Sequence, residues 1–287
     1  MVISKEALYQ IFLRHPNVAG AIGNVLPNLG FLRRYRHMFL AMNAVANHTT
    51  VVRHGPHEVR IAPTTLCNYR CLFCEIHKDD LIHPNRSQNI LSLDDIQKYD
   101  GFLSSARTVA FYGGAMEPLI NRDFGEIVKY LKTNYGLAMM LNTNAVPLTK
   151  KLADILVEYS FDDILVSYHA GTKDGYKFLM TGDIDRVDKN VGYLIEKRNA
   201  SNSKQPAVRF NFALQRMNAN ETKPIIDKAK LLGVDSVVVS KYYGGYNALQ
   251  QHDVAFDNNI EEGNRTLDEI YSYAAEQGVE LLPSKPD

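Results

Sequence analysis

The stretch from Thr64 to His77, TTLCNYRCLFCEIH, contains Cys67, Cys71 and Cys74, and these are the only cysteines in 287 residues. Three cysteines at this close spacing cannot form a disulfide framework. Three thiolates on one loop can face a common centre, so the spacing predicts a metal site. Two kinds of site fit: a structural zinc ion with His77 as the fourth ligand, or a four-iron cluster with one iron left open. Buried packing cysteines would explain neither the spacing nor the absence of cysteine elsewhere.

The composition is that of an ordinary globular protein, with 45% hydrophobic residues, 22% charged residues and a formal net charge of zero. This balance gives no indication of a nucleic-acid partner. The most apolar stretches are too short to span a bilayer and contain Asn and Pro, so no transmembrane segment is predicted. We therefore expect a cytoplasmic protein whose thiols stay reduced.

Short apolar runs alternate with amphipathic stretches from residue 58 onward. The alternation predicts a parallel sheet with helical crossovers, and we expect an α/β fold, a partial (βα)6 TIM-type barrel with an N-terminal helical extension. The cysteines follow the first strand, at the end of a barrel that carries active sites. Strands are predicted over 58–64, 108–114, 137–145, 163–170, 208–215 and 235–243, with a weaker one over 279–283, and helices over 92–103, 124–136, 150–160, 186–199, 221–233 and 262–277.

Residues 1–50 differ from the rest and are predicted to form a helical N-terminal extension, with residues 51–287 forming the barrel core and a C-terminal helix and strand. The stretch FLRRYRHMFLAMNAVA, residues 31–46, combines a basic group with an apolar run. A helix that packs on the barrel explains it, and a helix that docks on a membrane surface or a partner is the alternative. Residues 244–265 are predicted to form a long loop, a class of segment that is often functional.

Four segments carry a resemblance to a known family. C-x3-C-x2-C with Phe73 before the last cysteine resembles the signature of the radical S-adenosylmethionine superfamily, closest to its SPASM or twitch-type branch without the cysteine-rich C-terminal module. FYGGAMEPLINRDF (111–124), LNTNA (141–145) and VSYHAGTKDGY (166–176) resemble its glycine-rich, strand-three and strand-four segments. Ala115 and Met116 interrupt the usual Gly-Glu-Pro, His169 stands where Asp is common, and Met180 stands where Arg is frequent.

The resemblance implies that Cys67, Cys71 and Cys74 hold a [4Fe–4S] cluster whose open iron binds S-adenosyl-L-methionine. It implies an enzyme that receives one electron from a flavodoxin-type or ferredoxin-type donor and forms a 5′-deoxyadenosyl radical. That radical abstracts hydrogen from a peptide or a small natural-product substrate, with the class of the overall reaction left open. The implied cofactor-binding residues are Phe73, Gly113, Gly114, Glu117, Asn142, Asn144, Ser167, Asn211 and Ser240, and the catalytic candidates are Tyr112, His169, Arg209, Lys241 and Tyr242.

Two other functions stay open. One is a zinc-bound structural or interaction protein, and the other is a cluster protein that does not cleave S-adenosylmethionine. The C-terminus stops near the point where the branch begins its cysteine-rich module, so we expect a shortened chain or a member that lacks the module. We also expect a laterally open barrel of six parallel strands, with the N-terminal helices against one side and no second cluster.

Overall fold

The computed structural model describes residues 33–50, 55–74, 89–112, 116–241 and 259–283. These residues belong to two compact units. The first comprises Met1–Val59 and Gln97–Val109, and the second comprises Arg60–Ile96 and Ala110–Asp287. The predicted division into 1–50 and 51–287 stays a prediction. In the part of the chain that is described, no helix is both long enough and apolar enough to cross a membrane.

Among its described residues, the first unit contains the helices α3 (Arg33–Ala46) and α6 (Asp100–Leu103). The helix α3 covers most of the basic and apolar stretch for which a helix was predicted. After α6 the chain turns back toward the sheet, where the amides of Arg107 and Thr108 donate to the carbonyl of His57 at 3.2 and 3.1 Å. Leu103 is buried, with 1% of its surface exposed, and it anchors the end of α6 in this unit.

A seven-stranded sheet forms the framework, and its strand order follows the chain from β1 to β7. Every strand from β3 to β6 pairs in parallel with its successor. This arrangement confirms the predicted α/β fold of the partial TIM-barrel type. The weak seventh run pairs through only two residues of β6. The strands are β1 (Glu58–Arg60), β2 (Thr108–Phe111), β3 (Ala138–Thr143), β4 (Asp163–Ser167), β5 (Ala207–Leu214), β6 (Ser236–Lys241) and β7 (Leu281–Leu282).

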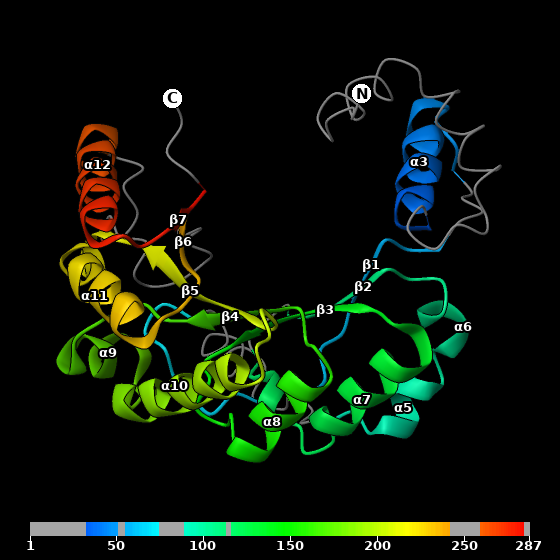
Figure 1. Cartoon of the computed structure of the whole chain (residues 1–287). Helices are drawn as coiled ribbons and strands as arrows, with labels where there is room; N and C mark the ends of the chain where they lie inside the picture. Colours follow the sequence, from blue (N-terminus) through cyan, green and yellow to red (C-terminus); the bar gives the residue numbers. More distant parts are fainter. Residues whose placement is uncertain (1–32, 51–54, 75–88, 113–115, 242–258, 284–287) are drawn as a thin grey trace. The chain divides into compact units, whose positions relative to one another are not determined.

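The helices between the strands lie along one side of the sheet, as Figure 1 shows for α7 to α11. Two of them, α7 and α11, end at Gly136 and Gly233, whose φ angles of 60° and 72° are the left-handed values that glycine adopts readily. The predicted helix over 92–103 is instead two short helices. The remaining helices and turns of the described residues are α5 (Leu93–Gln97), η1 (Pro118–Ile120), α7 (Phe124–Tyr135), α8 (Lys150–Glu158), α9 (Lys173–Met180), α10 (Ile184–Ala200), η2 (Arg216–Glu221), α11 (Thr222–Leu232) and α12 (Ile260–Gln277).

The two faces of β5 differ sharply. Val208, Phe210, Phe212 and Leu214 are buried, whereas the residues that alternate with them are partly exposed. Because successive side chains of a strand point to opposite faces, the buried set faces the helices and the other set lines the inner face of the sheet. Tyr168, stacked 4.0 Å from Phe210, belongs to the helical side. The apolar core therefore lies between sheet and helices, and the inner face is left to polar and small residues.

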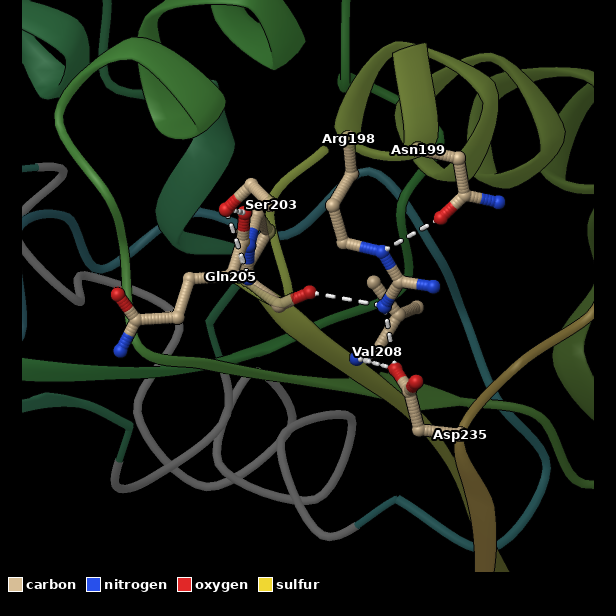
Figure 2. Close-up of polar contacts among 7 residues, drawn as sticks. Arg198, Asn199, Ser203, Gln205, Val208 and Asp235 are labelled. Carbon is tan, nitrogen blue, oxygen red and sulfur yellow. Dashed lines mark hydrogen bonds and ion pairs between the residues drawn. The ribbon is translucent and has the colours of Figure 1, made fainter. Parts of the chain in front are cut away.

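An ion pair between a buried arginine and an exposed aspartate lies at the amino-terminal edge of the sheet (Figure 2). Asp235 Oδ2 accepts a hydrogen bond from the amide of Val208 at 2.7 Å and from Arg198 NH1 at 2.5 Å. Arg198 also donates to the carbonyl of Pro206 at 3.0 Å and to Asn199 Oδ1 at 3.2 Å. With 6% of its surface exposed, Arg198 is buried, and its charge is balanced by Asp235. We name this arrangement an amino-edge clamp: an Asp before one strand, an amide of the preceding strand and a basic residue of a helix.

The same arrangement occurs two strands earlier. Asp162, which precedes β4, accepts hydrogen bonds through Oδ2 from the amide of Met139 and from Lys132 Nζ, both at 2.8 Å. Lys132 comes from α7, just as Arg198 comes from α10. The sheet thus carries two equivalent amino-edge clamps, one at the β3–β4 pair and one at the β5–β6 pair.

Candidate active site

The cysteine loop, defined as Cys67–Cys74, follows β1 and carries all three thiols. Cys67 Sγ accepts from the amide of Tyr69 at 3.5 Å, and the amide of Cys74 donates to the carbonyl of Cys71 at 3.1 Å. Burial raises the pKa of the Cys67 thiol, and burial together with the charges of Cys74 and Cys67 raises the pKa of Cys71. The mutual effect on Cys71 means that the sulfurs are near neighbours, which suits a site that stabilises thiolates with positive metal charge.

Within the described ranges, no three His, Cys, Asp or Glu side chains form a group that could hold a single metal ion. A four-iron cluster takes each thiolate ligand on a different iron. His77, the other ligand considered for zinc, lies outside the described residues.

The cysteine loop is hydrogen-bonded to the C-terminal end of α9. The amide of Leu72 donates to the carbonyl of Leu179 at 2.9 Å, and the amide of Arg70 donates to Thr181 Oγ1 at 2.9 Å. Cys71 Sγ lies 3.7 Å from the carbonyl oxygen of Met180. These contacts fix the loop by its backbone, which leaves the thiols available for metal.

Aromatic packing adds to this attachment. The rings of Tyr69 and Tyr176 meet edge to face, with centroids 6.3 Å apart. Tyr69 also lies against Gly182, where a Cβ atom would come within 2.1 Å of the Tyr69 ring and hydroxyl. Thr172 caps α9 by accepting from the amide of Gly175 at 3.1 Å. The Thr-x-x-x-Tyr pattern of the sequence thus has a physical explanation: Thr172 begins the helix and Tyr176 packs on the cysteine loop.

Glu117 joins the residue just before the cysteine loop to the end of β3. Its amide donates to the carbonyl of Leu66 at 2.8 Å. Its carboxylate accepts from Thr143 Oγ1 and the Asn144 amide, both at 2.6 Å, and from the Leu119 amide at 3.1 Å. Only 1% of Glu117 is exposed, and burial raises its pKa to about 7. The carboxylate predicted to bind cofactor is therefore occupied by protein donors.

Asn144 extends this connection. Its Nδ2 donates to Asn68 Oδ1 in the cysteine loop at 2.9 Å, and its Oδ1 accepts from the amide of Val146 at 3.0 Å. Sequence reasoning predicted Asn144 but missed Asn68 and Thr143. Thr143 lies between the two predicted asparagines of β3 and points to the opposite face, which the alternation of the strand could have indicated.

Four predicted residues form a row across the inner face of the sheet. Ser167 Oγ donates to Asn142 Oδ1 at 3.2 Å, and Ser240 Oγ donates to Asn211 Oδ1 at 3.1 Å. Ser167 and Asn211 lie opposite each other in the register of β4 and β5. All four side chains are partly exposed, near the carboxyl ends of their strands. This polar row offers hydroxyl and amide groups that can hydrogen-bond a ribose or an amino-acid moiety.

His169 is a neutral, buried imidazole beside the cysteine loop. Its Nδ1 accepts from the amide of Ala213 at 3.1 Å, and the ring of Phe73 meets it edge to face at 5.0 Å. With 6% of the residue exposed, burial lowers the pKa of His169 to about 4. Because Nδ1 is an acceptor, the proton of the neutral ring is on Nε2.

The remaining candidates are dispersed. The guanidinium of Arg60 lies 4.9 Å from the centre of the Tyr112 ring. Arg209 pairs with Asp163 at 3.3 Å. Asp163 is the first residue of β4, so this pair lies toward the amino-terminal edge, away from the cysteine loop. The side chain of Lys241 and the whole of Gly113, Gly114 and Tyr242 lie outside the described residues.

A family model and curated relatives match the chain. The Radical SAM superfamily model matches residues 61–204, which is half of the chain. A "Probable GTP 3′,8-cyclase" of Sulfurisphaera tokodaii is 28% identical over 226 residues, covering 78% of this chain and 65% of the relative. Another, of Metallosphaera sedula, is 28% identical over 186 residues, covering 63% and 54%. The chain thus spans less than two thirds of the length of these curated relatives.

Solved structures resemble the fold at low sequence identity. Streptococcus suis SuiB bound to S-adenosylmethionine aligns with a TM-score of 0.64 and 16% identity, over 96% of this chain and 61% of SuiB. The structure of anSMEcpe with bound AdoMet aligns with a TM-score of 0.61 and 15% identity, over 79% of this chain and 63% of anSMEcpe. These alignments show that the architecture is shared with those two proteins.

Proposed function

The chain belongs to the radical SAM superfamily, and from this premise we propose that it cleaves S-adenosyl-L-methionine reductively at a [4Fe–4S] cluster and abstracts hydrogen from an organic substrate. One observation carries the proposal. The cysteine loop gathers three thiols beside the carboxyl ends of the strands and is bonded to β2, β3 and α9 segments by its backbone and by Asn68. A partial barrel places its chemistry at that edge.

Cys67, Cys71 and Cys74 would hold the cluster, each through its thiolate. When bound, the cluster and S-adenosyl-L-methionine together supply a 5′-deoxyadenosyl radical, the species that abstracts hydrogen. An external one-electron donor of the flavodoxin or ferredoxin type would deliver the electron.

The side chains of the protein would bind and orient. The polar row provides hydrogen-bonding groups on the inner face of the sheet that the cysteine loop adjoins. Its members are Asn142, Ser167, Asn211 and Ser240. Phe73, packed against His169, supplies an apolar wall. Because His169 is neutral at physiological pH, it adds no charge next to the thiolates. Aromatic C–H bonds are strong and do not readily give a hydrogen atom to a carbon radical, so such a wall protects the radical from side reactions.

A peptide or a small natural product is the proposed substrate class. Support comes from the fold, since a SuiB structure in complex with the precursor peptide SuiA aligns over 96% of this chain at a TM-score of 0.61. A purine nucleoside triphosphate is the second candidate. It is favoured by the higher identity of 28% to the probable GTP 3′,8-cyclases. Incubation of the reduced enzyme with each class, followed by mass spectrometry of the products, separates the two.

The test of the shared chemistry begins with protein purified without oxygen. We expect a brown protein with about four iron and about four sulfide per chain, which forms 5′-deoxyadenosine when dithionite and S-adenosylmethionine are added. Replacing any of the three cysteines by Ala should abolish the cluster, whereas His77→Ala should keep it. A colourless protein with one zinc ion would support the structural zinc site instead. A brown protein that never forms 5′-deoxyadenosine would indicate a cluster without this cleavage.

A further inference from the structure

A buried carboxylate outside the proposed site has no role in the chemistry so far described. Glu221, the last residue of η2 after β5, has 6% of its surface exposed. Its Oε2 accepts from the amides of Gly171 and Thr172 at 3.0 and 2.9 Å, and its Oε1 accepts from Thr172 Oγ1 at 2.8 Å. A buried charge with several donors is expensive to disturb, since its loss leaves backbone amides without acceptors.

The carboxylate is fitted closely beneath the first turn of α9. A Cβ atom at Gly175 would lie 2.2 Å from Glu221 Oε1, and one at Gly171 would lie 2.3 Å from the carbonyl carbon of Pro224. Both glycines therefore permit a close approach that a side chain would prevent. A negative charge at a helix N-terminus is also favourable to the helix dipole. The amino-terminal end of α9 is thus seated on Glu221.

The other end of α9 holds the cysteine loop. Leu179 and Thr181 accept the amides of Leu72 and Arg70, as described above. The helix is 8 residues long, so about 12 Å separates its ends. Displacement at one end of so short a helix is transmitted to the other end, because the helix moves as a rigid unit.

We propose that Glu221 is a positioning residue for the cysteine loop: it fixes α9, and α9 fixes the thiols in the geometry that the cluster needs. None of the hydrogen bonds described for Glu221 goes to a cysteine, so its effect on the thiols is indirect and passes through α9. The inference rests on the proposed function, in which the thiols hold a cluster. It predicts that cluster retention depends on a residue that no cysteine contacts.

The experiment measures how fast the reduced, anaerobic holoenzyme loses iron to a chelator. Glu221→Met keeps the size of the side chain but removes every acceptor, and we expect iron to be lost about tenfold faster. Glu221→Gln can keep its carbonyl on the two amides and donate to Thr172 Oγ1, so iron loss should stay within about threefold of wild type. Gly175→Ala, which pushes the carboxylate aside without removing it, should act like Glu221→Met.

The matched control lies at the opposite edge of the sheet. Asp235→Asn replaces a carboxylate that, like that of Glu221, accepts from a backbone amide and from a second group, here buried Arg198. None of the hydrogen bonds of this clamp goes to α9. We expect it to lower the stability to urea while leaving iron loss unchanged. A readout that needs no iron is hydrogen exchange of residues 70–72, which Glu221→Met should accelerate and Asp235→Asn should not.

The outcomes separate the hypotheses. Glu221→Met with wild-type iron loss and wild-type exchange at residues 70–72 would overturn the positioning role. Equal acceleration by Asp235→Asn would also overturn it, because the effect would then be one of general stability. A wild-type chain that takes up no iron would overturn the proposed function, and exchange at residues 70–72 would still decide whether Glu221 holds the loop.

Discussion

Acidification should destabilise the protein through His169, because this imidazole is buried and neutral. Protonation would place a charge in a desolvated site and would remove the acceptor that Nδ1 provides to the amide of Ala213. The change tested is His169→Asn. The Asn Oδ1 can take nearly the same position as Nδ1 and accept from the same amide, yet it does not titrate. The substitution therefore isolates the effect of the proton from that of the hydrogen bond.

The size of the effect follows from the two pKa values. In the unfolded chain His169 has an ordinary pKa near about 6.5, and in the folded protein burial lowers the pKa to about 4. The folded-state pKa is the lower one, so the unfolded state binds the proton more tightly between these values. Stability is therefore complete above about pH 6.5 and falls as the pH decreases toward 4. At a pH of about 5 the loss amounts to about 2 kcal/mol.

The assay is urea unfolding of iron-free protein, followed by circular dichroism and by tyrosine fluorescence, since the chain has no Trp and 16 Tyr. Removing iron prevents acid loss of a cluster from contributing. The wild type should lose about 2 kcal/mol more than His169→Asn between a pH of about 7.5 and about 5. Any cost of the substitution itself is the same at both pH values and cancels. Equal losses for the two proteins would refute a neutral, buried His169.

Three further predictions concern the surroundings of the site and the opposite edge. Glu117→Gln should remove a pH-dependent contribution to stability whose sign is opposite to that of His169. Burial raises the folded pKa of Glu117 from 4.5 to about 7, so this contribution falls as the pH rises through that window. Urea midpoints of variant and wild type at several pH values measure it. Arg198→Met should destabilise the fold by about 1 kcal/mol, because the buried Pro206 carbonyl loses its donor and the 41% exposed Asp235 side chain loses its partner, and a double-mutant cycle with Asp235→Asn should show non-additive losses. Thr181→Gly should relieve a left-handed conformation at φ 57° and raise thermal stability, but it should speed iron loss because the Arg70 amide loses its acceptor.

Much of the architecture could be predicted because strands buried by helices have a local signature. Each apolar run from 58 onward became a strand, since such runs are typical of sheets covered by helices. The strand ends were less predictable. Residues 61–64 were assigned to the first strand, but β1 ends at Arg60, and Thr64 instead bridges Ile90 in an antiparallel contact. The helix α9 was also missed, because Lys173–Met180 was interpreted only as a motif.

The site was predictable where spacing along one strand decides direction. Asn142 was expected to point into the barrel from alternation, Ser167 was implied by the strand-four resemblance, and the structure brings the two into contact. The residues that hold the loop were not predictable in this way. Glu221 meets Thr172 across 49 positions of sequence, and Thr181 meets Arg70 across 111. Such partners depend on how loops from different strands pack, and no local pattern distinguishes them from exposed polar residues.

Because the amino-edge clamp is repeated, two strand pairs of the sheet are anchored separately. Each clamp belongs to its own pair of strands, so the β3–β4 and β5–β6 pairs are each secured at the edge that does no chemistry. The loops at the opposite edge are therefore not needed to hold these strand pairs together. A lineage of such proteins can exchange or lengthen those loops, and so acquire new substrates, while the anchoring of each strand pair is inherited unchanged. Adding or deleting a whole strand pair with its own clamp would widen or narrow the barrel by one self-sufficient block.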